Sequence, residues 1–97
     1  MITKFLEKIL SICCEEFECS VSDVVSKSRK EQFVFCRKAF AMIVKTELDI
    51  KNDVPAKMIK RRHQSVANYV KTLPANKYFK HAFLKATERV RNESGIS

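Results

Sequence analysis

Apolar side chains recur at helical spacing along most of the chain. In residues 2–17, Phe5, Ile9 and Phe17 fall near one face of a helix, and Lys8 falls on the opposite face. The same spacing continues, interrupted by short polar stretches, almost to the C-terminal end. The pattern predicts an all-α fold of about six helices, over about 2–17, 21–27, 30–48, 54–59, 62–72 and 75–92.

Capping and helix-breaking residues mark several of these boundaries. Ser20 is placed to cap the second helix, and Asp23 three residues later completes a capping box. Asp53 is expected to cap the short fourth helix, with Pro55 in its first turn, where the missing N–H costs nothing. Pro74 ends the fifth helix. These residues therefore predict a succession of short helices.

The helix predicted over 30–48 is the longest and has the widest apolar side. Phe40 and Ile43 lie on its main apolar stripe, and Ala39 and Met42 widen that stripe. We therefore expect this helix to be central, with the others packed around it. Its polar stripe is cationic and is expected to be exposed; it comprises Lys30, Arg37, Lys38 and Lys45.

The helix predicted over 62–72 has two faces of different character. Its inward face is expected to carry apolar or aromatic side chains, namely Val66, Tyr69, Val70 and Leu73. Its opposite face is polar and has no carboxylate that would repel a phosphate. That outward face consists of Arg61, Gln64, Ser65, Asn68 and Lys71.

The composition fits one packed domain. The chain has 97 residues, 45% of them hydrophobic and seven of them Phe, enough for a single modest core. One Gly and two Pro leave little turn chemistry for β-hairpins. No stretch approaches the roughly 20 apolar residues of a membrane span, and charges interrupt the N-terminal apolar segment, unlike a signal peptide. We expect a cytoplasmic protein that does not interact with membranes.

The four cysteines, Cys13, Cys14, Cys19 and Cys36, form no metal-binding or redox motif at the level of sequence. Their spacing contains no C-x-x-C pair, and three of them stand among apolar residues. The expected state is reduced thiols, mostly buried, in a reducing compartment. No cofactor and no metal are predicted.

The net charge of +8 comes from one block of the chain. Residues 54–87 hold eight Lys or Arg and no Asp or Glu. Residues 1–53 contain nine charges of each sign, and residues 88–97 contain two of each sign. A cationic stripe that opens a short helix is the electrostatic signature of a protein that binds nucleic acid.

Two helices in tandem, joined by a tight connection, predict a helix-turn-helix over about 54–72. The second helix of that motif enters the major groove of DNA, and its first-turn side chains reach the base edges. Arg can donate two hydrogen bonds to guanine, and Gln can pair with adenine. The side chains at this position are those of Arg61, Arg62, His63 and Gln64.

Three segments carry a resemblance to a known family. Val21-Ser-Asp-Val-Val-Ser-Lys-Ser-Arg29 is similar to V-x-D-L-L-S-K-x-R, and Arg37-Lys-Ala-Phe-Ala-Met-Ile-Val-Lys45 is similar to R-Q-x-A-M-x-L-x-K. Arg61-Arg-His63-Gln-Ser65-Val66 is similar to R-D-H-S/T-T-V. In this order, over about residues 5–91, the chain resembles the C-terminal DNA-binding domain (domain IV) of the bacterial replication initiator DnaA. That family has a six-helix fold related to the Trp-repressor helix-turn-helix.

The resemblance implies roles by position. Arg29 would enter the minor groove, and base edges in the major groove would be contacted by Arg62, His63 and Gln64. The DNA backbone would be held by Arg37, Lys38, Arg61, Ser65 and Asn68. Lys71, on the same outward face, is expected to contact the backbone as well.

The chain departs from the family pattern at positions that affect recognition. Arg62 stands where the family has an Asp, so an acceptor has become a donor, and Gln64 replaces a Thr. Glu31 stands where the family usually has a basic residue. The family's glycines in the helix-turn-helix are absent, and the segment is about two residues shorter. The DNA sequence that the chain prefers is therefore expected to differ from the initiator's box.

Three functional classes fit these observations. The first is a small double-stranded DNA-binding protein in replication or transcription control, or in a phage or mobile element, associated with the nucleoid. The second is a protein-interaction module that retains the fold and binds an acidic partner. The third, an RNA-binding protein, ranks last because the outward face of residues 61–71 has no aromatic platform.

An enzyme is not expected. With one Gly, two His and no paired acid and base, the chain offers no constellation for catalysis and no small-molecule substrate is predicted. The sequence also lacks G-x-x-x-x-G-K-S/T, so the initiator's ATPase module is absent. The Met1 start favours a separate DNA-binding protein over a fragment of a larger one, and a monomer is expected.

Overall fold

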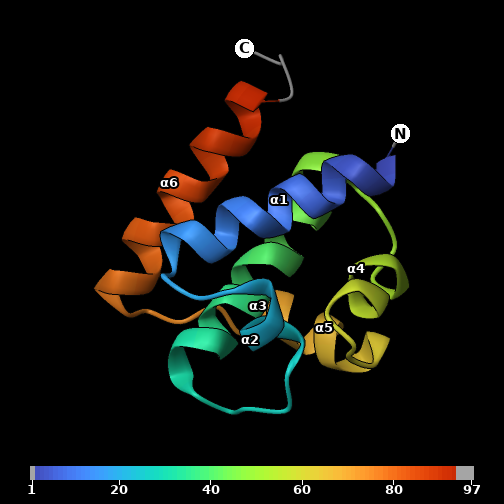
Figure 1. The fold of residues 1–97 in the computed structure, drawn as a ribbon, viewed down its shortest axis with the longest axis horizontal. Helices are drawn as coiled ribbons and strands as arrows, with labels where there is room; N and C mark the ends of the chain where they lie inside the picture. Colours follow the sequence, from blue (N-terminus) through green and yellow to red (C-terminus); the bar gives the residue numbers. More distant parts are fainter. Residues whose placement is uncertain (1, 94–97) are drawn as a thin grey trace.

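The computed structural model describes residues 2–93, with side chains from Lys4 onward, and within that range the regular structure is helical (Figure 1). The all-α prediction is confirmed, and the predicted boundaries agree to within two residues at every end but the last turn of the third helix. The elements are α1 (Ile2–Glu16), α2 (Val21–Val25), α3 (Glu31–Ile43), η1 (Val44–Leu48), α4 (Asp53–Met58), α5 (His63–Lys71) and α6 (Lys77–Glu93).

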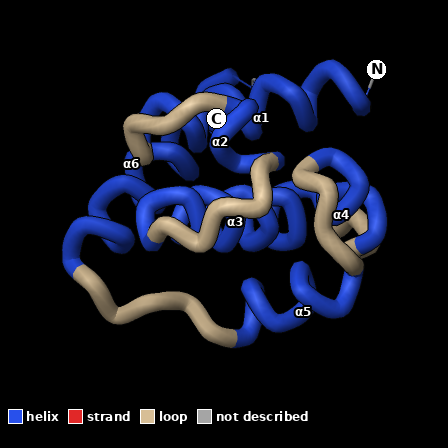
Figure 2. Tube along the Cα trace, turned by 60° about the horizontal axis from the view of Figure 1, so that its bottom comes forward, coloured by secondary structure: helices blue, strands red, loops and turns tan. Residues whose placement is uncertain are grey.

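Helix α3 is the centre of the fold, as its broad apolar side predicts. It packs against α1, α2, α4, α5 and α6. Figure 2 shows α3 running between α5 on one side and α1 with α6 on the other. Seven of its thirteen residues are buried, so almost every face of the helix meets another element. The position of α5 is consequently set by α3 and α4.

The last turn of this helix is wider than an α-turn. Residues Val44–Leu48 form a π-helix, and the Thr46 hydroxyl donates to the Met42 carbonyl at 2.9 Å. The backbone then reverses at Asp49, which has a φ of 52°. The helix predicted over 30–48 is therefore continuous, but its final turn is a π-turn, a form that hydrophobic spacing cannot predict.

A cluster of aromatic rings forms one end of the core. The Phe79 ring lies 5.7 Å from that of Phe17, 5.5 Å from that of Phe35 and 5.5 Å from that of Phe83, stacked in the last case. Tyr78 meets Phe17 edge to face at 5.9 Å. These contacts join α1, α3 and α6, elements far apart in sequence.

At the opposite end of α6, ion pairs add to the packing of α1 and η1, from Arg89 to Glu15 and Glu16, from Arg91 to Glu47 and from Lys8 to Glu93.

The capping box at α2 is confirmed. The Ser20 hydroxyl accepts a hydrogen bond from the Asp23 N–H at 3.1 Å, and the Asp23 carboxylate accepts one from the Ser20 N–H at 3.0 Å. Two other expectations were wrong. Asp53 is the first residue of α4 and follows an N-cap at Asn52, which makes no side-chain capping bond. Leu73 lies beyond the end of α5 and is 37% exposed, so it does not point inward.

Helix α4 ends in a Schellman turn that sets the direction of α5. Lys60 adopts the left-handed conformation, with a φ of 53°. Its N–H bonds the Lys57 carbonyl at 3.3 Å, and the Arg61 N–H bonds the Ala56 carbonyl at 2.8 Å. A lysine therefore occupies a conformation that glycine adopts without steric cost.

The four cysteines are free thiols, as predicted. Cys13, Cys14 and Cys36 are buried, and Cys19 is half-buried. Burial raises the pKa of the Cys13 thiol well above its ordinary value. Among the described residues, no helix is both long enough and apolar enough to cross a membrane.

Replacing Lys60 by glycine should stabilise the protein. The substitution removes the steric cost of a side chain in the left-handed conformation, so we expect the free energy of unfolding to rise by about 1 kcal/mol. Lys57→Gly is the matched control, because Lys57 is an exposed residue inside α4. That variant should lose about 0.5–1 kcal/mol. Urea unfolding followed by circular dichroism measures both values, and equal losses in the two variants would contradict the assignment.

Candidate nucleic-acid interface

Helix α5 presents a line of polar side chains to solvent. Gln64, Asn68 and Lys71 are exposed and follow one another at spacings of four and three residues, so they share one face. On the opposite face, Val66 is fully buried and holds the helix to the core. Nine residues give a helix about 13 Å long. An α-helix with its side chains is about 10–12 Å in diameter, which matches a major groove about 12 Å wide.

Helix α5 begins without the usual side-chain cap. Its N-cap residue is Arg62, in an extended conformation, and no side-chain capping bond is formed there. A guanidinium has only donors, so it cannot satisfy the free N–H groups of the first turn. The beginning of α5 therefore combines exposed backbone donors, the positive end of the helix dipole and an exposed cationic side chain. Each of these attracts an anionic oxygen.

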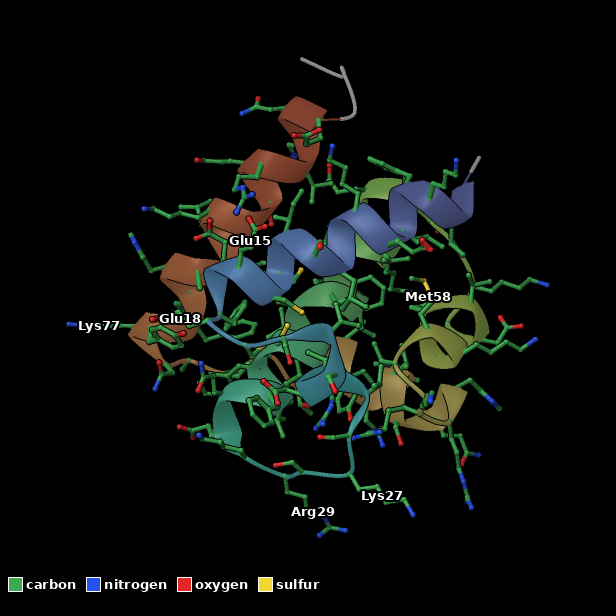
Figure 3. All side chains as sticks on the ribbon, in the orientation of Figure 1. Glu15, Glu18, Lys27, Arg29, Met58 and Lys77 are labelled. Atoms are coloured by element: carbon green, nitrogen blue, oxygen red, sulfur yellow. The ribbon has the colours of Figure 1, made fainter. Side chains whose placement is uncertain are left out.

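A basic groove runs between the first turn of α5 and the loop that joins α2 to α3. Its volume is about 480 Å³. The groove contains four cationic side chains and no carboxylate, and its lining consists of Lys27, Ser28, Arg29, Val34, Arg37, Arg61, Ser65 and Tyr69. Figure 3 shows Lys27 and Arg29 extending from this loop away from the body of the protein. We refer to it below as the 27–65 groove.

The loop beside this groove is shaped by short-range hydrogen bonds. The Ser28 N–H donates to the Ser26 hydroxyl at 3.3 Å, and the Lys30 N–H donates to the Ser28 hydroxyl at 3.2 Å. Serine side chains thus satisfy backbone donors that no helix covers. The connector bends so that Lys27 and Arg29 both remain exposed.

Arg37 is not the exposed phosphate contact that its position on the polar stripe suggested. Its side chain is 2% exposed, and its guanidinium donates to the carbonyls of Val24 at 2.7 Å, Ser26 at 3.0 Å and Asp23 at 3.3 Å. Burial, and then the neighbouring charge of Arg61, lower the pKa of Arg37. Arg37 is therefore a structural residue that holds the C-terminal end of α2.

Two further residues predicted to hold the DNA backbone bond other parts of the protein. Arg61 is half-buried and donates to the Ser26 carbonyl and, at 3.1 Å, to the Lys60 carbonyl. Lys38 is half-buried and donates to the Thr72 carbonyl at 3.0 Å, at the end of α5. Both keep a positive charge near the surface, but their hydrogen bonds orient α5.

The structure brings some predicted residues together and separates others. Arg29 and Ser65 line the same groove, although 36 positions separate them in the sequence. His63 is exposed on the other side of the start of α5, where it shares a shallow depression with Lys51, Asn52 and Asp53. A carboxylate therefore borders His63 but not the 27–65 groove.

Lys27 is a candidate contact that the sequence reading did not single out. It is exposed and lines the 27–65 groove beside Arg29. Its signal lay in the segment Val21 to Arg29 that resembles the initiator family.

A search of protein families, a search of curated proteins and a search of solved structures all give no match to this chain.

Replacing Arg37 with methionine should destabilise the protein. The change removes one donor from each of three carbonyls. Those of Asp23 and Ser26 keep other donors, but the buried Val24 carbonyl loses its bond, so we expect a loss of about 1–3 kcal/mol in the free energy of unfolding. Lys45→Met is the control, because Lys45 is exposed about two turns further along, in η1, and should change stability by less than about 0.5 kcal/mol. An Arg37→Met variant that unfolds like the parent but loses affinity for DNA would contradict the structural role.

Proposed function

We propose that this protein binds double-stranded DNA with α5 in the major groove and the 27–65 groove against the adjacent backbone. The observation that carries the proposal is the joining of two basic features in space. The exposed face of α5, which has no carboxylate, lies beside a groove lined by four cations from three segments of the chain. The resemblance to domain IV of DnaA supports the same arrangement.

The distribution of charge over the fold favours this face. The carboxylates of Glu15, Glu16, Glu47 and Glu93 are in ion pairs with α6 and α1. Helices α1 and α6 lie across α3 from α5 (Figure 2). These carboxylates are therefore neutralised away from α5. The 27–65 groove is lined by cations without a carboxylate, while Asp53 and Asp49 lie near the two ends of α5, beside His63 and Lys71. Such a separation of charge orients the molecule as it approaches a polyanion.

The exposed side chains divide into base contacts and backbone contacts. Arg62 and Gln64, at the start of α5, carry the donors that read guanine and adenine. His63 lies beside them toward α4, and Arg29 extends from the loop toward the neighbouring minor groove. Along the length of the helix, Ser65, Asn68 and Lys71 face the phosphates, with Lys27 added from the loop. Arg37, buried under this surface, bonds the carbonyls at the end of α2 and so fixes the position of the loop.

An acidic protein surface would also be attracted to this face. The two partners differ in what they require of the first turn of α5. DNA requires Arg62 and Gln64 for discrimination between base pairs, whereas an acidic protein requires only positive charge. Selection of a preferred sequence from a randomised duplex library therefore separates the two. Enrichment of a motif supports DNA reading, and a library that stays random, with weak binding, supports the protein partner.

Arg62→Ala should reduce sequence discrimination. We expect a loss of about 1–3 kcal/mol in binding to the selected site and relaxed preference at one base pair, with little change on random duplex. Fluorescence anisotropy with both duplexes measures the difference. Lys4→Ala is the matched control, because Lys4 is exposed on α1, across α3 from α5. A folded Arg62→Ala variant with unaltered affinity and motif would remove α5 from the major groove.

Lys71→Ala should weaken binding to all duplex sequences alike. A lysine that neutralises one phosphate releases about one counterion, so the slope of log affinity against log salt should fall in magnitude by about 1. Titrations between about 50 and 300 mM salt give the slope. Removing the same charge at Lys4 should leave the slope unchanged. If both variants lowered the slope equally, binding would be governed by net charge and not by α5.

A further inference from the structure

Three cysteine sulfurs meet at one point beside the start of the α2 segment. The Sγ atoms of Cys14, Cys19 and Cys36 all lie within 4.8 Å of one another, and those of Cys14 and Cys36 are 4.0 Å apart. The three residues come from three separate segments, the last turn of α1, the turn that follows it and the middle of α3. Their convergence is a property of the fold and is invisible as a sequence motif.

The turn after α1 is built so that Cys19 folds back beneath Cys14. Glu18 adopts the left-handed conformation, with a φ of 56°. The Glu18 N–H then bonds the Glu15 carbonyl at 3.3 Å, and the Cys19 N–H bonds the Cys14 carbonyl at 2.9 Å. This is a Schellman turn with a non-glycine residue at its left-handed position. Direct backbone bonding between Cys14 and Cys19 fixes the two thiols on the same side.

Helix α3 holds the same turn from the other side. The Gln32 amide donates to the Glu18 carbonyl at 2.7 Å and also to the Phe17 carbonyl. Gln32 and Cys36 are four residues apart, so they share one face of α3. The glutamine therefore locks the turn onto α3 at the place where Cys36 presents its sulfur. The three thiols are arranged in advance by backbone and side-chain bonds.

The separation of the sulfurs suits a single soft metal ion. Metal–sulfur bonds of 2.3 Å at tetrahedral angles separate two sulfurs by about 3.8 Å, and a trigonal arrangement separates them by about 4.0 Å. The observed Cys14–Cys36 separation of 4.0 Å falls at this value. A disulfide would use two of the three sulfurs, whereas one metal ion uses all three.

The surroundings suit a charged complex that remains accessible. Cys36 is fully buried and Cys14 is 4% exposed, while Cys19 is half-buried and gives a path from solvent. One divalent ion with three thiolates carries a net charge of about −1. Arg37 follows Cys36 in α3, and its guanidinium is buried against the adjoining end of α2. A buried cation thus already stands near the excess negative charge.

We propose that Cys14, Cys19 and Cys36 form a site for one thiophilic metal ion of the zinc class, with three thiolate ligands and a fourth position open toward solvent. The ion would join α1, its following turn and α3. It would fix the base on which α2 and the 27–65 groove rest. The site is independent of the proposed binding of DNA, because none of its ligands lines the interface.

Cobalt(II) is the probe of choice, because tetrahedral thiolate sites give it charge-transfer and visible absorption bands that zinc lacks. Reduced protein, freed of metal and kept under anaerobic conditions, is titrated with Co²⁺ and then with Zn²⁺. We expect saturation at one equivalent of Co²⁺ and a charge-transfer absorption as intense as three thiolate ligands produce. Zinc should then displace the cobalt, because zinc binds thiolate ligands more tightly than cobalt does. Zinc should also raise the melting temperature of the parent protein.

Cys19→Ser is the decisive variant, because Cys19 is half-exposed and its replacement leaves the core intact. Loss of an outer-shell partner costs about 10–100-fold in metal affinity, so loss of a direct ligand should cost more than about 100-fold. Cys13→Ser is the control: Cys13 is buried in the same helical turn, but its sulfur is not in the group. Its variant should keep the parent's affinity and cobalt spectrum.

Circular dichroism establishes that each variant is folded before its affinity is compared. The proposal is overturned if the folded, reduced parent gives no thiolate-to-cobalt band, or if Cys19→Ser binds as tightly as the parent. It is also overturned if a Cys14–Cys36 disulfide forms and the reduced protein has no affinity for cobalt or zinc. In that case the cluster is a pair of oxidisable thiols.

Discussion

The guanidinium of Arg37 is the interaction on which the arrangement of the interface depends. It is buried in α3 and bonds three carbonyls at the end of α2, so it satisfies acceptors that the end of a helix leaves free. One of those carbonyls, that of Ser26, also accepts from Arg61 at the start of the α5 segment. Two arginines thus share an acceptor and connect the basic loop and the start of α5 to one point.

A buried charge is stabilising only when its hydrogen bonds are nearly complete, because desolvation opposes it. Arg37 meets this requirement by using carbonyl oxygens, which carry partial negative charge without a carboxylate. The consequence for the surface is important. No acidic side chain is needed beneath the 27–65 groove, so the cations above it are not neutralised from below. The hydrogen bonds from Arg37 to carbonyl oxygens therefore stabilise the fold and also leave the surface potential above them positive.

The sequence was sufficient for the helices and for much of the exposed face of α5. Amphipathic spacing located every helix, because burial of one face imposes the period, and the Ser20 box marked the start of α2. It was insufficient for Arg37, whose place on a cationic stripe is indistinguishable from that of an exposed lysine until α2 is known to end against it. It was also insufficient for the thiol cluster. Cys36 meets Cys14 through the packing of α3 on α1, and Cys19 joins them through a turn that contains no glycine. Contacts between distant segments were, in each case, the missing information.

Three consecutive residues of α3 reach three different parts of the protein. Cys36 lies against the turn after α1, Arg37 against the end of α2, and Lys38 against the end of α5. Each residue of a helix is rotated by about 100° from the last, which is why neighbours in sequence can serve separate regions. One inserted or deleted residue within α3 would turn all three away from their partners at once. The rotational phase of this buried helix, more than any exposed side chain, is therefore the feature that changes in the length of α3 would disrupt.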